Sequence, residues 1–530
     1  MVRAKVAHKF RLGLWTMLMS VGCGEALQLK DFRVHSDADA SVGVDAGAKR
    51  SDGCTRNAEC ASATDTGARS GPTICHKPTK RCVTLTSEDC QTVTGDHSDD
   101  DALIIGSLFS TSGAQASINR AREQSAILAV EEINAAGGVP AGATSAGSRP
   151  LVLVSCDEAQ LLRAAGHLVT NLGVPAIIGP NTSQDTLDLS NKLTIGSGTL
   201  VISPTAVASS IADLLDNDLT WQMVPTDVQR APLMRAEINT LEQPLRAARG
   251  RNRLKLAVIY RDDALGQGTR LGLNSLEFNG APLSDPMNLG SNVQILPYQP
   301  SQMGQTALVD ATLKLAPDIV VLAGTAEAVT QVLVPLERGW TGPPGSRPEY
   351  VLIDSLRTPE LIDAVTGNPE LRRRIRGTGA RPATRSIPVN EAFMVSYATR
   401  HPNETTNLFG MGSAYDATYA VAYGIAALRG RAVTGRSIAQ MLPLLGRGGI
   451  EVELQGSKVL SAFRHLTETT PVTIIGTSAP LVWDDHGAIL GGTIELWCIS
   501  EAAGRASYDS SGITYDLQLG RTEGTYVQCP

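Results

Sequence analysis

The chain has 530 residues, of which 42% are hydrophobic and 19% are charged, and these proportions are typical of folded globular proteins. At roughly 150 residues per domain, the length allows two to four domains. The formal net charge of −7 offers no basic surface for nucleic acid, and no apolar run approaches the ~18 residues of a membrane-spanning helix. The charge thus gives no electrostatic indication of a nucleic-acid-binding protein, and a polytopic membrane protein is excluded.

The first 22 residues are predicted to be a signal peptide and not part of the fold. Four basic residues precede an uncharged stretch over 12–22: Arg3, Lys5, Lys9 and Arg11. This order is that of a secretory signal. The sequence that ends in Gly22-Cys23 resembles a bacterial lipoprotein signal, in which Cys23 is lipidated and becomes the new N-terminus. The alternative is an ordinary cleaved signal followed by a coincidental Cys, and both interpretations predict export.

Residues 23–53 are predicted to form a disordered tether, because they are rich in Asp, Ala, Ser and Gly and contain almost no large apolar residues. Residues 54–100 contain five cysteines among turn-forming residues, so we expect a small disulfide-stapled module that ends in an acidic linker. The acidic stretch at 96–101 can be interpreted as a cation site or as a solvated linker. The linker is favoured, because nothing in the sequence fixes a ligand geometry.

Eight cysteines remain when Cys23 is set aside, and an even number favours disulfides in an exported protein. Their spacing contains no C-x2-C pair and fits no common zinc pattern. We therefore expect disulfides and no metal site. The disulfide candidates are Cys54, Cys60, Cys75, Cys82, Cys90, Cys156, Cys498 and Cys529.

From residue 101 onwards, short apolar runs alternate with amphipathic stretches of helical length. The runs are typical of buried parallel strands and lie at 103–105, 151–154, 175–179, 200–202, 256–259, 319–322 and 350–353. This alternation predicts an α/β fold of doubly wound parallel sheets. Because roughly 400 residues exceed a single core, we expect two such units.

Three loops that follow predicted strands are rich in hydroxyls: 110–113, 179–183 and 203–206. In open α/β sheets, ligands bind outside the carboxyl ends of the strands, where helix N-termini offer N–H groups to anions. The alternative is that these Ser and Thr residues only cap their helices. Three such loops converging on one crevice favour a binding site.

Enzymes are disfavoured because no catalytic motif is present. The sequence lacks a G-x-S-x-G elbow, a G-x-x-x-x-G-K phosphate loop and an H-E-x-x-H pair. His167 lies in an amphipathic helical pattern and is interpreted as a packing or surface residue, and Cys156 is better explained by a disulfide than by a nucleophile. We expect neither catalysis nor a cofactor.

Seven segments, in order, resemble type I periplasmic binding proteins, in the leucine/isoleucine/valine-binding branch that serves ABC importers. They are IGSLFS (105–110), AVEEINAAGGV (129–139), IGP (178–180), ISP (202–204), DDALGQG (262–268), YDATY (415–419) and WDDHG (483–487). The resemblance spans about 102–498. It implies two lobes over 101–498 that close on a ligand by a hinge motion, with a first crossover near 221–229. Residues 499–530 would form a C-terminal extension.

The resemblance also implies a ligand site. Thr182 and Ser183 match hydroxyls that hold the carboxylate of an amino-acid ligand, and Thr205 and Ala206 lie in a loop that offers backbone groups. Asp354 is the nearest match to the acid that pairs with the ligand ammonium. Smaller side chains stand where the family has stacking aromatics: Ile118, Leu265 and Thr325. The expected ligand is zwitterionic or an amide and is at least as large as leucine.

The same resemblance bears on the disulfides. In the family, a Cys near the place of Cys156 pairs with a Cys in the Gly-Pro loop, where this chain has Thr182. Cys90, the fifth cysteine of the module, is then the candidate partner of Cys156. The other pairs would form within 54–82 and between Cys498 and Cys529.

Taken together, these features predict an exported, lipid-anchored solute-binding protein of the periplasm or cell envelope. It would capture a small polar ligand, amino-acid-like or an amide, for an ABC permease, and contact the membrane only through its lipid. One alternative on the same fold is a ligand-sensing or envelope-interaction receptor without transport. Another is a degenerate pocket with an architectural role.

Overall fold

The computed structural model describes residues 53–61, 71–113, 115–143, 147–302, 304–343, 345–405, 408–527 and 529. The predicted signal peptide, Cys23 and nearly all of the predicted tether lie outside these residues. Among the helices that are described, none combines the length and the apolar character needed to cross a bilayer.

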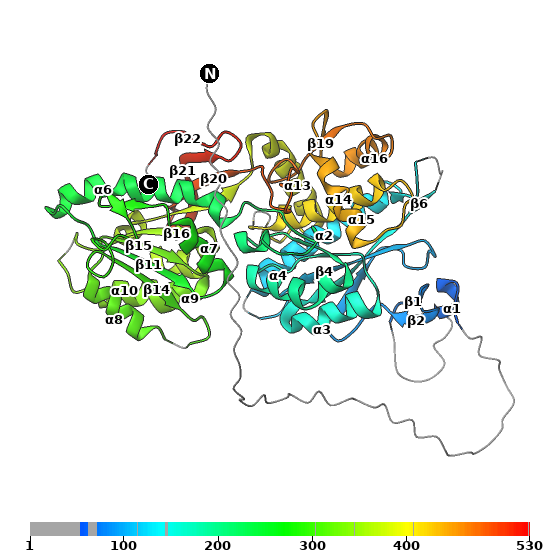
Figure 1. Cartoon of the computed structure of the whole chain (residues 1–530), viewed down its shortest axis with the longest axis horizontal. Coiled ribbons are helices and arrows are strands. Elements are labelled where there is room, and N and C mark those ends of the chain that lie inside the picture. The colour runs from blue at the N-terminus through cyan, green and yellow to red at the C-terminus, as the bar shows by residue number, and fades with distance from the viewer. Residues whose placement is uncertain are drawn as a thin grey trace, which may run out of the picture. The chain divides into compact units, whose positions relative to one another are not determined.

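The first lobe is built on a six-stranded sheet with the order β10-β9-β8-β4-β7-β3 (Figure 1). Its strands are β3 (Cys90–Thr94), β4 (Leu103–Phe109), β7 (Leu151–Asp157), β8 (Ala176–Ile178), β9 (Leu200–Ser203) and β10 (Thr220–Gln222). All neighbours are parallel except β3, which is antiparallel to β7. The predicted apolar runs form the central strands, because a strand covered by helices on both faces is apolar along its whole length.

The second lobe is built on an eight-stranded sheet with the order β14-β11-β15-β16-β17-β20-β21-β22. Its parallel part contains β11 (Leu256–Arg261), β14 (Val293–Tyr298), β15 (Ile319–Ala323), β16 (Glu349–Ile353) and β17 (Ile375–Arg381). Its antiparallel edge contains β20 (Thr493–Ala502), β21 (Arg505–Asp516) and β22 (Arg521–Glu523). The expected boundary at residue 498 falls inside β20, so the C-terminal residues widen this sheet, which is mixed and not purely parallel.

Helices cover both sheets. Those of the first lobe are α2 (Ala116–Ala135), α3 (Leu161–Gly166), α4 (Ser183–Leu189), α5 (Ile195–Ser197), α13 (Ile387–Arg400), α14 (Met411–Ala427), α15 (Gly435–Ala439) and α16 (Val459–Thr467). Those of the second lobe are α6 (Asp227–Arg249), α7 (Ala264–Gly272), α8 (Thr306–Leu315), α9 (Ala326–Ala328), α10 (Val334–Gly339), α11 (Pro359–Val365) and α12 (Pro369–Arg373). Each lobe has its own large hydrophobic core, as the predicted division into two units requires.

The described chain passes between the lobes at three places. The first crossing leads from β10 into α6, where the resemblance placed it, the second from β17 into α13, and the third from Ile489 into β20. The first and third crossings are bonded together. The Gln229 side chain donates to the Ile489 carbonyl over 2.9 Å, and the Trp483 indole donates to the Gln222 carbonyl over 3.0 Å.

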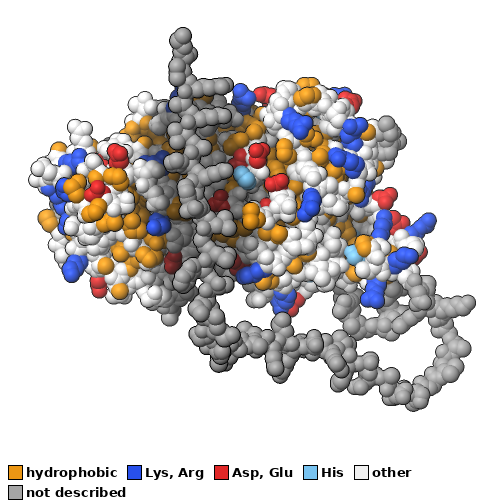
Figure 2. All heavy atoms as spheres, in the orientation of Figure 1, with side chains coloured by type: hydrophobic (Ala, Val, Ile, Leu, Met, Phe, Trp, Pro, Cys, Tyr) orange, Lys and Arg blue, Asp and Glu red, His pale blue; other side chains and the backbone are white. Residues whose placement is uncertain are grey.

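The Cys-rich module contains α1 (Asn57–Ala61), β1 (Thr73–His76) and β2 (Arg81–Thr84), with β1 and β2 paired antiparallel. Four disulfides are present: Cys54–Cys75, Cys60–Cys82, Cys90–Cys156 and Cys498–Cys529. The pairs Cys90–Cys156 and Cys498–Cys529 are those that were expected, and the pairing within 54–82, which the sequence left open, is Cys54–Cys75 and Cys60–Cys82. On the face seen in Figure 2, acidic and basic side chains are interspersed and do not gather by sign.

Candidate ligand-binding site

A small cavity lies where the loops after the strands of the two lobes meet. Val207, which follows β9 in the first lobe, contributes to its wall opposite residues of the second lobe such as Leu265 and Thr378. The volume is about 20 Å³, which is room for about one water molecule. A ligand of the size of an amino acid therefore needs the lobes to move apart.

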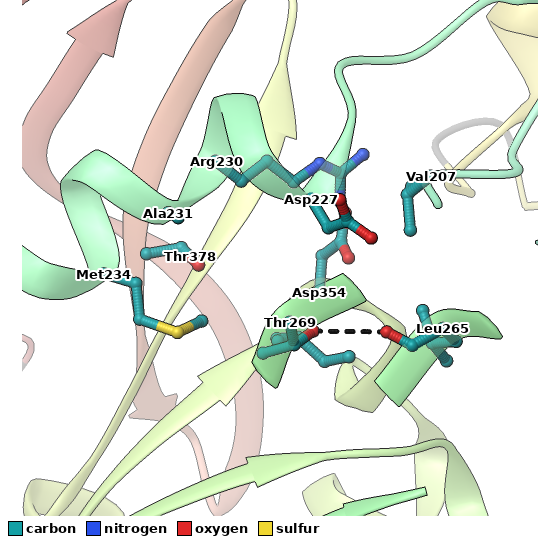
Figure 3. A pocket seen from close by; sticks show the side chains of 10 residues that line it. Val207, Asp227, Arg230, Ala231, Met234, Leu265, Thr269, Asp354 and Thr378 are labelled. Carbon is teal, nitrogen blue, oxygen red and sulfur yellow. Dashed lines mark hydrogen bonds and ion pairs between the residues drawn. The ribbon is translucent and has the colours of Figure 1, made fainter. Parts of the chain in front are cut away.

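Arg230 and Asp354 form a buried ion pair in this cavity (Figure 3). Arg230 lies in the first turn of α6, and Asp354 follows the last residue of β16. The Arg230 Nη1 donates to the Asp354 Oδ2, the Nε donates to the Pro225 carbonyl over 2.8 Å, and the Nη2 is buried without a partner. Both side chains are 7% exposed. The carboxylate that was expected to meet a ligand ammonium is thus already paired with a cation of the chain.

Asp227 is a second buried carboxylate in the cavity wall. Its Oδ1 accepts hydrogen bonds from the backbone N–H groups of Ser209 and Val228, over 3.2 and 2.7 Å. Its Oδ2 has no hydrogen-bond partner and packs against α7, since a Cβ at Gly268 would lie 1.4 Å from it. Burial raises the pKa of Asp227 to about 6, although backbone hydrogen bonds and the Arg230 charge oppose that shift.

The predicted hydroxyl residues after β8 hold the local backbone in place. Thr182 is exposed and caps α4, where its Oγ1 accepts from the Asp185 N–H over 3.0 Å. Ser183 is buried, and its Oγ accepts from the N–H groups of Val207 and Ala208 over 3.0 and 3.1 Å. Thr182 therefore acts as a cap, whereas Ser183 positions a loop that reaches the cavity.

The loop after β9 is fixed in a similar way. The Thr205 hydroxyl donates to the Asn181 carbonyl over 2.6 Å, and the Ala206 N–H donates to the Ser203 Oγ over 3.1 Å. Both residues are buried. These bonds join the two loops of the first lobe and set the position from which Val207 faces the second lobe.

The chain matches the family model described as periplasmic binding protein over residues 103–443. It belongs to this family. The family consists of ligand-binding proteins of ABC transporters, which are exported to the periplasm and are not enzymes. No curated protein matches the chain significantly in sequence.

Solved structures agree on the fold. LivJ of Streptococcus pneumoniae, solved with isoleucine, is 20% identical at a TM-score of 0.52 and covers 77% of this chain and 99% of its own. A solute-binding protein from Rhodopseudomonas palustris, solved with 3,4-dihydroxybenzoic acid, is 14% identical at a TM-score of 0.54. The match covers 81% of this chain and 99% of that protein. A fatty acid ABC transporter substrate-binding protein from Thermomonospora curvata is 17% identical at a TM-score of 0.54. The match covers 82% of this chain and 96% of that protein.

In this periplasmic binding protein, Leu265 and Asp354 line the cavity, and the other predicted site residues lie outside its wall. Thr325 follows β15, where its hydroxyl donates to Glu327 and accepts from the Arg261 Nη1 at 3.2 Å. Ile118 is half-buried on α2. Apart from Ile118, the predicted positions thus lie in segments that follow strands, but few of their side chains meet.

Arg230, which lines the cavity, was not predicted from the sequence, and neither were Phe409 and Arg122, which lie next to it outside the cavity wall. The guanidinium carbons of Arg122 and Arg230 lie 5.9 and 6.0 Å from the centre of the Phe409 ring, within cation–π range. The Arg122 Nε also donates to the Phe409 carbonyl over 2.9 Å, which fixes the ring to the first lobe. The sequence did contain a signal for Arg230. This residue lies four positions before Met234 on the apolar face of a predicted helix, and a charged side chain on such a face needs a buried partner of opposite charge.

Glu158 adds a further buried carboxylate at the end of β7. Its Oε1 accepts from the Ser110 hydroxyl over 2.8 Å, and its Oε2 accepts from the Asn181 N–H at 3.4 Å. Burial raises the pKa of Glu158 to about 7, against the opposing effect of the Ser110 hydrogen bond. Burial also lowers the pKa of Arg122 to about 10, and the nearby Glu158 charge opposes that shift.

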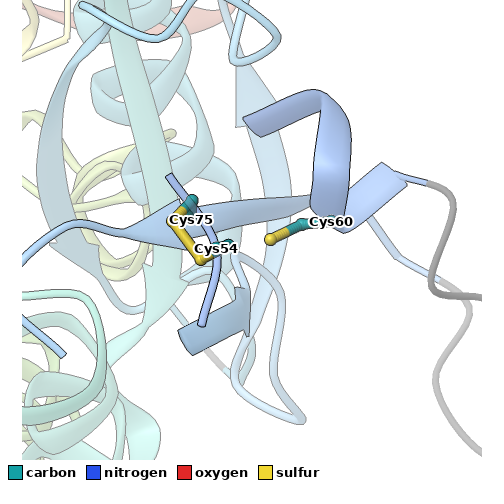
Figure 4. Close-up of side chains that lie close together, drawn as sticks. All are labelled: Cys54, Cys60 and Cys75. Atoms are coloured by element: carbon teal, nitrogen blue, oxygen red, sulfur yellow. A yellow bond between two sulfur atoms is a disulfide. The ribbon is translucent and has the colours of Figure 1, made fainter. Parts of the chain in front are cut away.

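In the Cys-rich module, the sulfurs of Cys54, Cys60 and Cys75 lie within 4.8 Å of one another, a spacing that a metal ion could bridge (Figure 4). Cys54 is bonded to Cys75, and Cys60 is bonded to Cys82. A metal ion binds the thiolate form of cysteine. These sulfurs therefore form disulfides and offer no thiolate ligands.

Proposed function

We propose that this protein is the substrate-binding protein of an ABC importer and that it carries a small ligand with a carboxylate group between its two lobes. The observation that carries this proposal is the unpaired, buried Nη2 of Arg230 in the cavity between the lobes. A buried donor is normally hydrogen-bonded, and carboxylates are the preferred partners of guanidinium groups.

The family and its solved members support the proposal. The ligands named for the similar structures are isoleucine, 3,4-dihydroxybenzoic acid and fatty acid, and each of these molecules contains a carboxylate. The crossings between the lobes support a hinge motion, because the first and third are hydrogen-bonded to each other and the second leaves β17 where that strand pairs with the start of β20. An ABC permease is the proposed partner of the loaded form.

We extend the proposal to export and lipid anchoring at Cys23. Mass spectrometry of the protein from a bacterial membrane fraction should give a mature chain that begins at Cys23 and carries acyl chains. A Cys23→Ser variant should lose the acyl chains and leave the membrane fraction. An N-terminus elsewhere, without acylation, would contradict the anchor and favour the ordinary signal.

The ligand is to be found by a thermal-shift screen of the full chain against amino acids, small carboxylates, amides and peptides. A compound that binds only the folded state raises the melting temperature by mass action. We expect at least one carboxylate to do so. If no compound of the screen shifts the transition, the transport function is overturned and an architectural role is favoured. Uptake of the identified ligand by cells with and without the protein then separates an importer from a receptor.

A further inference from the structure

We propose that the second lobe has a separate binding site for a short peptide with free termini, in an open cavity at the end of its sheet that is remote from the first lobe. The peptide carboxylate binds beside Arg347 and Arg374 in the deep part of this cavity, and the peptide ammonium group lies among carboxylates nearer the mouth. This inference goes beyond the proposed function, because it concerns a different site and a different ligand.

The distal cavity is lined by residues of α10, α11 and α12 and of the segments just before β16 and β17. Its volume is about 550 Å³, which is within the range of small-molecule binding sites. Asp354, which lines the cavity between the lobes, follows the other end of β16. Because β16 and β17 are parallel, the two cavities lie at opposite ends of the second-lobe sheet.

Two guanidinium groups share one carboxylate in the deep part of the distal cavity. The Glu337 carboxylate accepts from the Nη1 and Nη2 of Arg374 over 2.9 and 2.7 Å and from the Arg347 Nη1 over 2.8 Å. The Tyr350 hydroxyl also donates to it, over 2.7 Å. The side chains of Glu337 and Arg374 are only 12% and 11% exposed, and the Arg374 Nε is buried without an acceptor. This group therefore has one positive charge in excess, and a carboxylate is the preferred partner of a guanidinium.

Glu370 does not provide that partner. Its Oε1 lies 4.0 Å from the Arg347 Nε, which is too far for a hydrogen bond. Its side chain is 63% exposed, and ion pairs of exposed side chains contribute little to stability. A ligand carboxylate that enters the distal cavity can therefore take the place beside Arg347.

Carboxylates predominate nearer the mouth. Among the exposed residues that line the distal cavity, Asp363 and Glu370 are acidic and Arg338 is basic. Glu360 lies one turn before Asp363 on α11, and its Oε2 is buried without a hydrogen-bond donor. An ammonium group supplies the donors and the positive charge that these carboxylates lack.

The rest of the wall fits the body of a peptide. Val334, Ala364 and Leu371 contribute apolar surface, as is usual for a site in which a few polar groups orient the ligand. Because the partners of the carboxylate and of the ammonium group lie at different depths, the ligand must have its opposite charges at two ends. A short peptide with free termini has this arrangement.

The test uses triglycine and its two blocked forms as probes. Isothermal titration calorimetry of the full chain is performed with triglycine, with N-acetyltriglycine, which lacks the ammonium group, and with triglycinamide, which lacks the carboxylate. We expect triglycine to bind at least about tenfold more tightly than either blocked form, because each of these loses hydrogen bonds between charged groups.

Two variants assign the ends of the peptide. Arg347→Gln should weaken triglycine and N-acetyltriglycine about tenfold and leave triglycinamide unchanged. Glu360→Gln should weaken triglycine and triglycinamide and leave N-acetyltriglycine unchanged. Lys314→Gln and Asp310→Asn are the matched controls, because these exposed residues of α8 give the same changes of charge outside the distal cavity.

The outcomes separate this inference from the proposed function. The double variant Arg230→Met/Asp354→Leu alters the cavity between the lobes without leaving a buried charge unpaired, and it should bind triglycine as wild type does. If triglycine binding is lost in this double variant and kept in Arg347→Gln, the peptide binds between the lobes, so the inference is overturned and the proposed function stands. Equal binding of the three peptides, or no saturable binding of triglycine, would also overturn it.

Discussion

Cys90 in β3 lies directly opposite Cys156 in β7, in the antiparallel pairing of these two strands, and the disulfide between them ties the edge strand that follows the N-terminal module to the first-lobe sheet. The bond closes a segment of 66 residues that includes β4, the strand next to β7 in the sheet. It therefore constrains part of the first-lobe core as well as the module.

Replacing both partners, Cys90→Ala/Cys156→Ala, should lower the free energy of unfolding of the first lobe by about 4 kcal/mol, the chain-entropy expectation for a loop of this length. Denaturant unfolding followed by tryptophan fluorescence measures this change, because Trp221, Trp340, Trp483 and Trp497 all lie outside the module. Cys54→Ala/Cys75→Ala is the control, since that bond closes 21 residues within the module. Equal effects of the two double variants on tryptophan fluorescence would contradict this role.

A second prediction concerns the close approach of α6 and α7. Gly268→Ala places a methyl group 1.4 Å from the Asp227 Oδ2, so either the Asp227 carboxylate leaves its hydrogen bonds or the two helices separate. We expect a loss of about 1–3 kcal/mol of stability and a smaller ligand-induced thermal shift. Gly166→Ala in α3 meets nothing within 4 Å and should be neutral or stabilising by up to about 1 kcal/mol. If thermal unfolding shows the same melting temperature for both variants, the packing of Asp227 against α7 is not tight.

The third prediction uses the raised pKa of Asp227. Because this pKa is about 6 in the folded protein against 3.8 ordinarily, the folded state retains a proton that the unfolded chain releases between these pH values. The contribution of Asp227 to stability therefore falls as pH rises from about 4 to about 6 and then stays constant.

Asp227→Asn should remove this dependence, because the amide oxygen can still accept from Ser209 and Val228. The difference in unfolding free energy between wild type and variant, measured by urea titration, should shift in favour of the variant by up to about 3 kcal/mol between pH 4 and pH 7. A difference that does not change with pH would show that Asp227 titrates in the same range in the folded and unfolded chains.

The architecture was accessible from the sequence because it depends on local patterns. A strand buried on both faces must be apolar throughout, and this marked β4, β7, β11 and β15 without ambiguity. The antiparallel strand β21 was not predicted from the sequence. Several of its residues are exposed or half-buried, such as Ser507 and Tyr508, so the strand contains no continuous apolar run. The boundary at residue 498 was therefore drawn inside the second sheet.

The site was less accessible because its side chains meet only in the folded chain. Arg230 and Asp354 are 124 residues apart, and they pair because α6 packs against the ends of β16 and β17 in the second lobe. Motif positions pointed to loops that follow strands, but they could not tell that Thr182 caps its helix or that Asp354 has a partner in the chain. Ordinary helix capping and an internal ion pair involve the same residue types as ligand binding.

The last prediction concerns Gln229, which bonds the first crossing to the third. Its Oε1 accepts from the Thr226 N–H over 2.7 Å as part of a capping box at the start of α6, and its Nε2 donates to the Ile489 carbonyl over 2.9 Å. Gln229→Glu keeps the acceptor that caps the helix but loses the donor, and Gln229→Ala loses both.

Loss of the capping-box bond from the Thr226 N–H costs about 1 kcal/mol, and loss of the bond to Ile489 costs about another 1 kcal/mol. The melting temperature in thermal unfolding should therefore be highest for wild type, lower for Gln229→Glu and lowest for Gln229→Ala. Amide hydrogen exchange at 489–492 should accelerate in both variants, because the third crossing is then released from the first. Unchanged exchange in Gln229→Glu would mean that the two crossings move together without this bond, and the hinge would then be held by the Trp483–Gln222 contact.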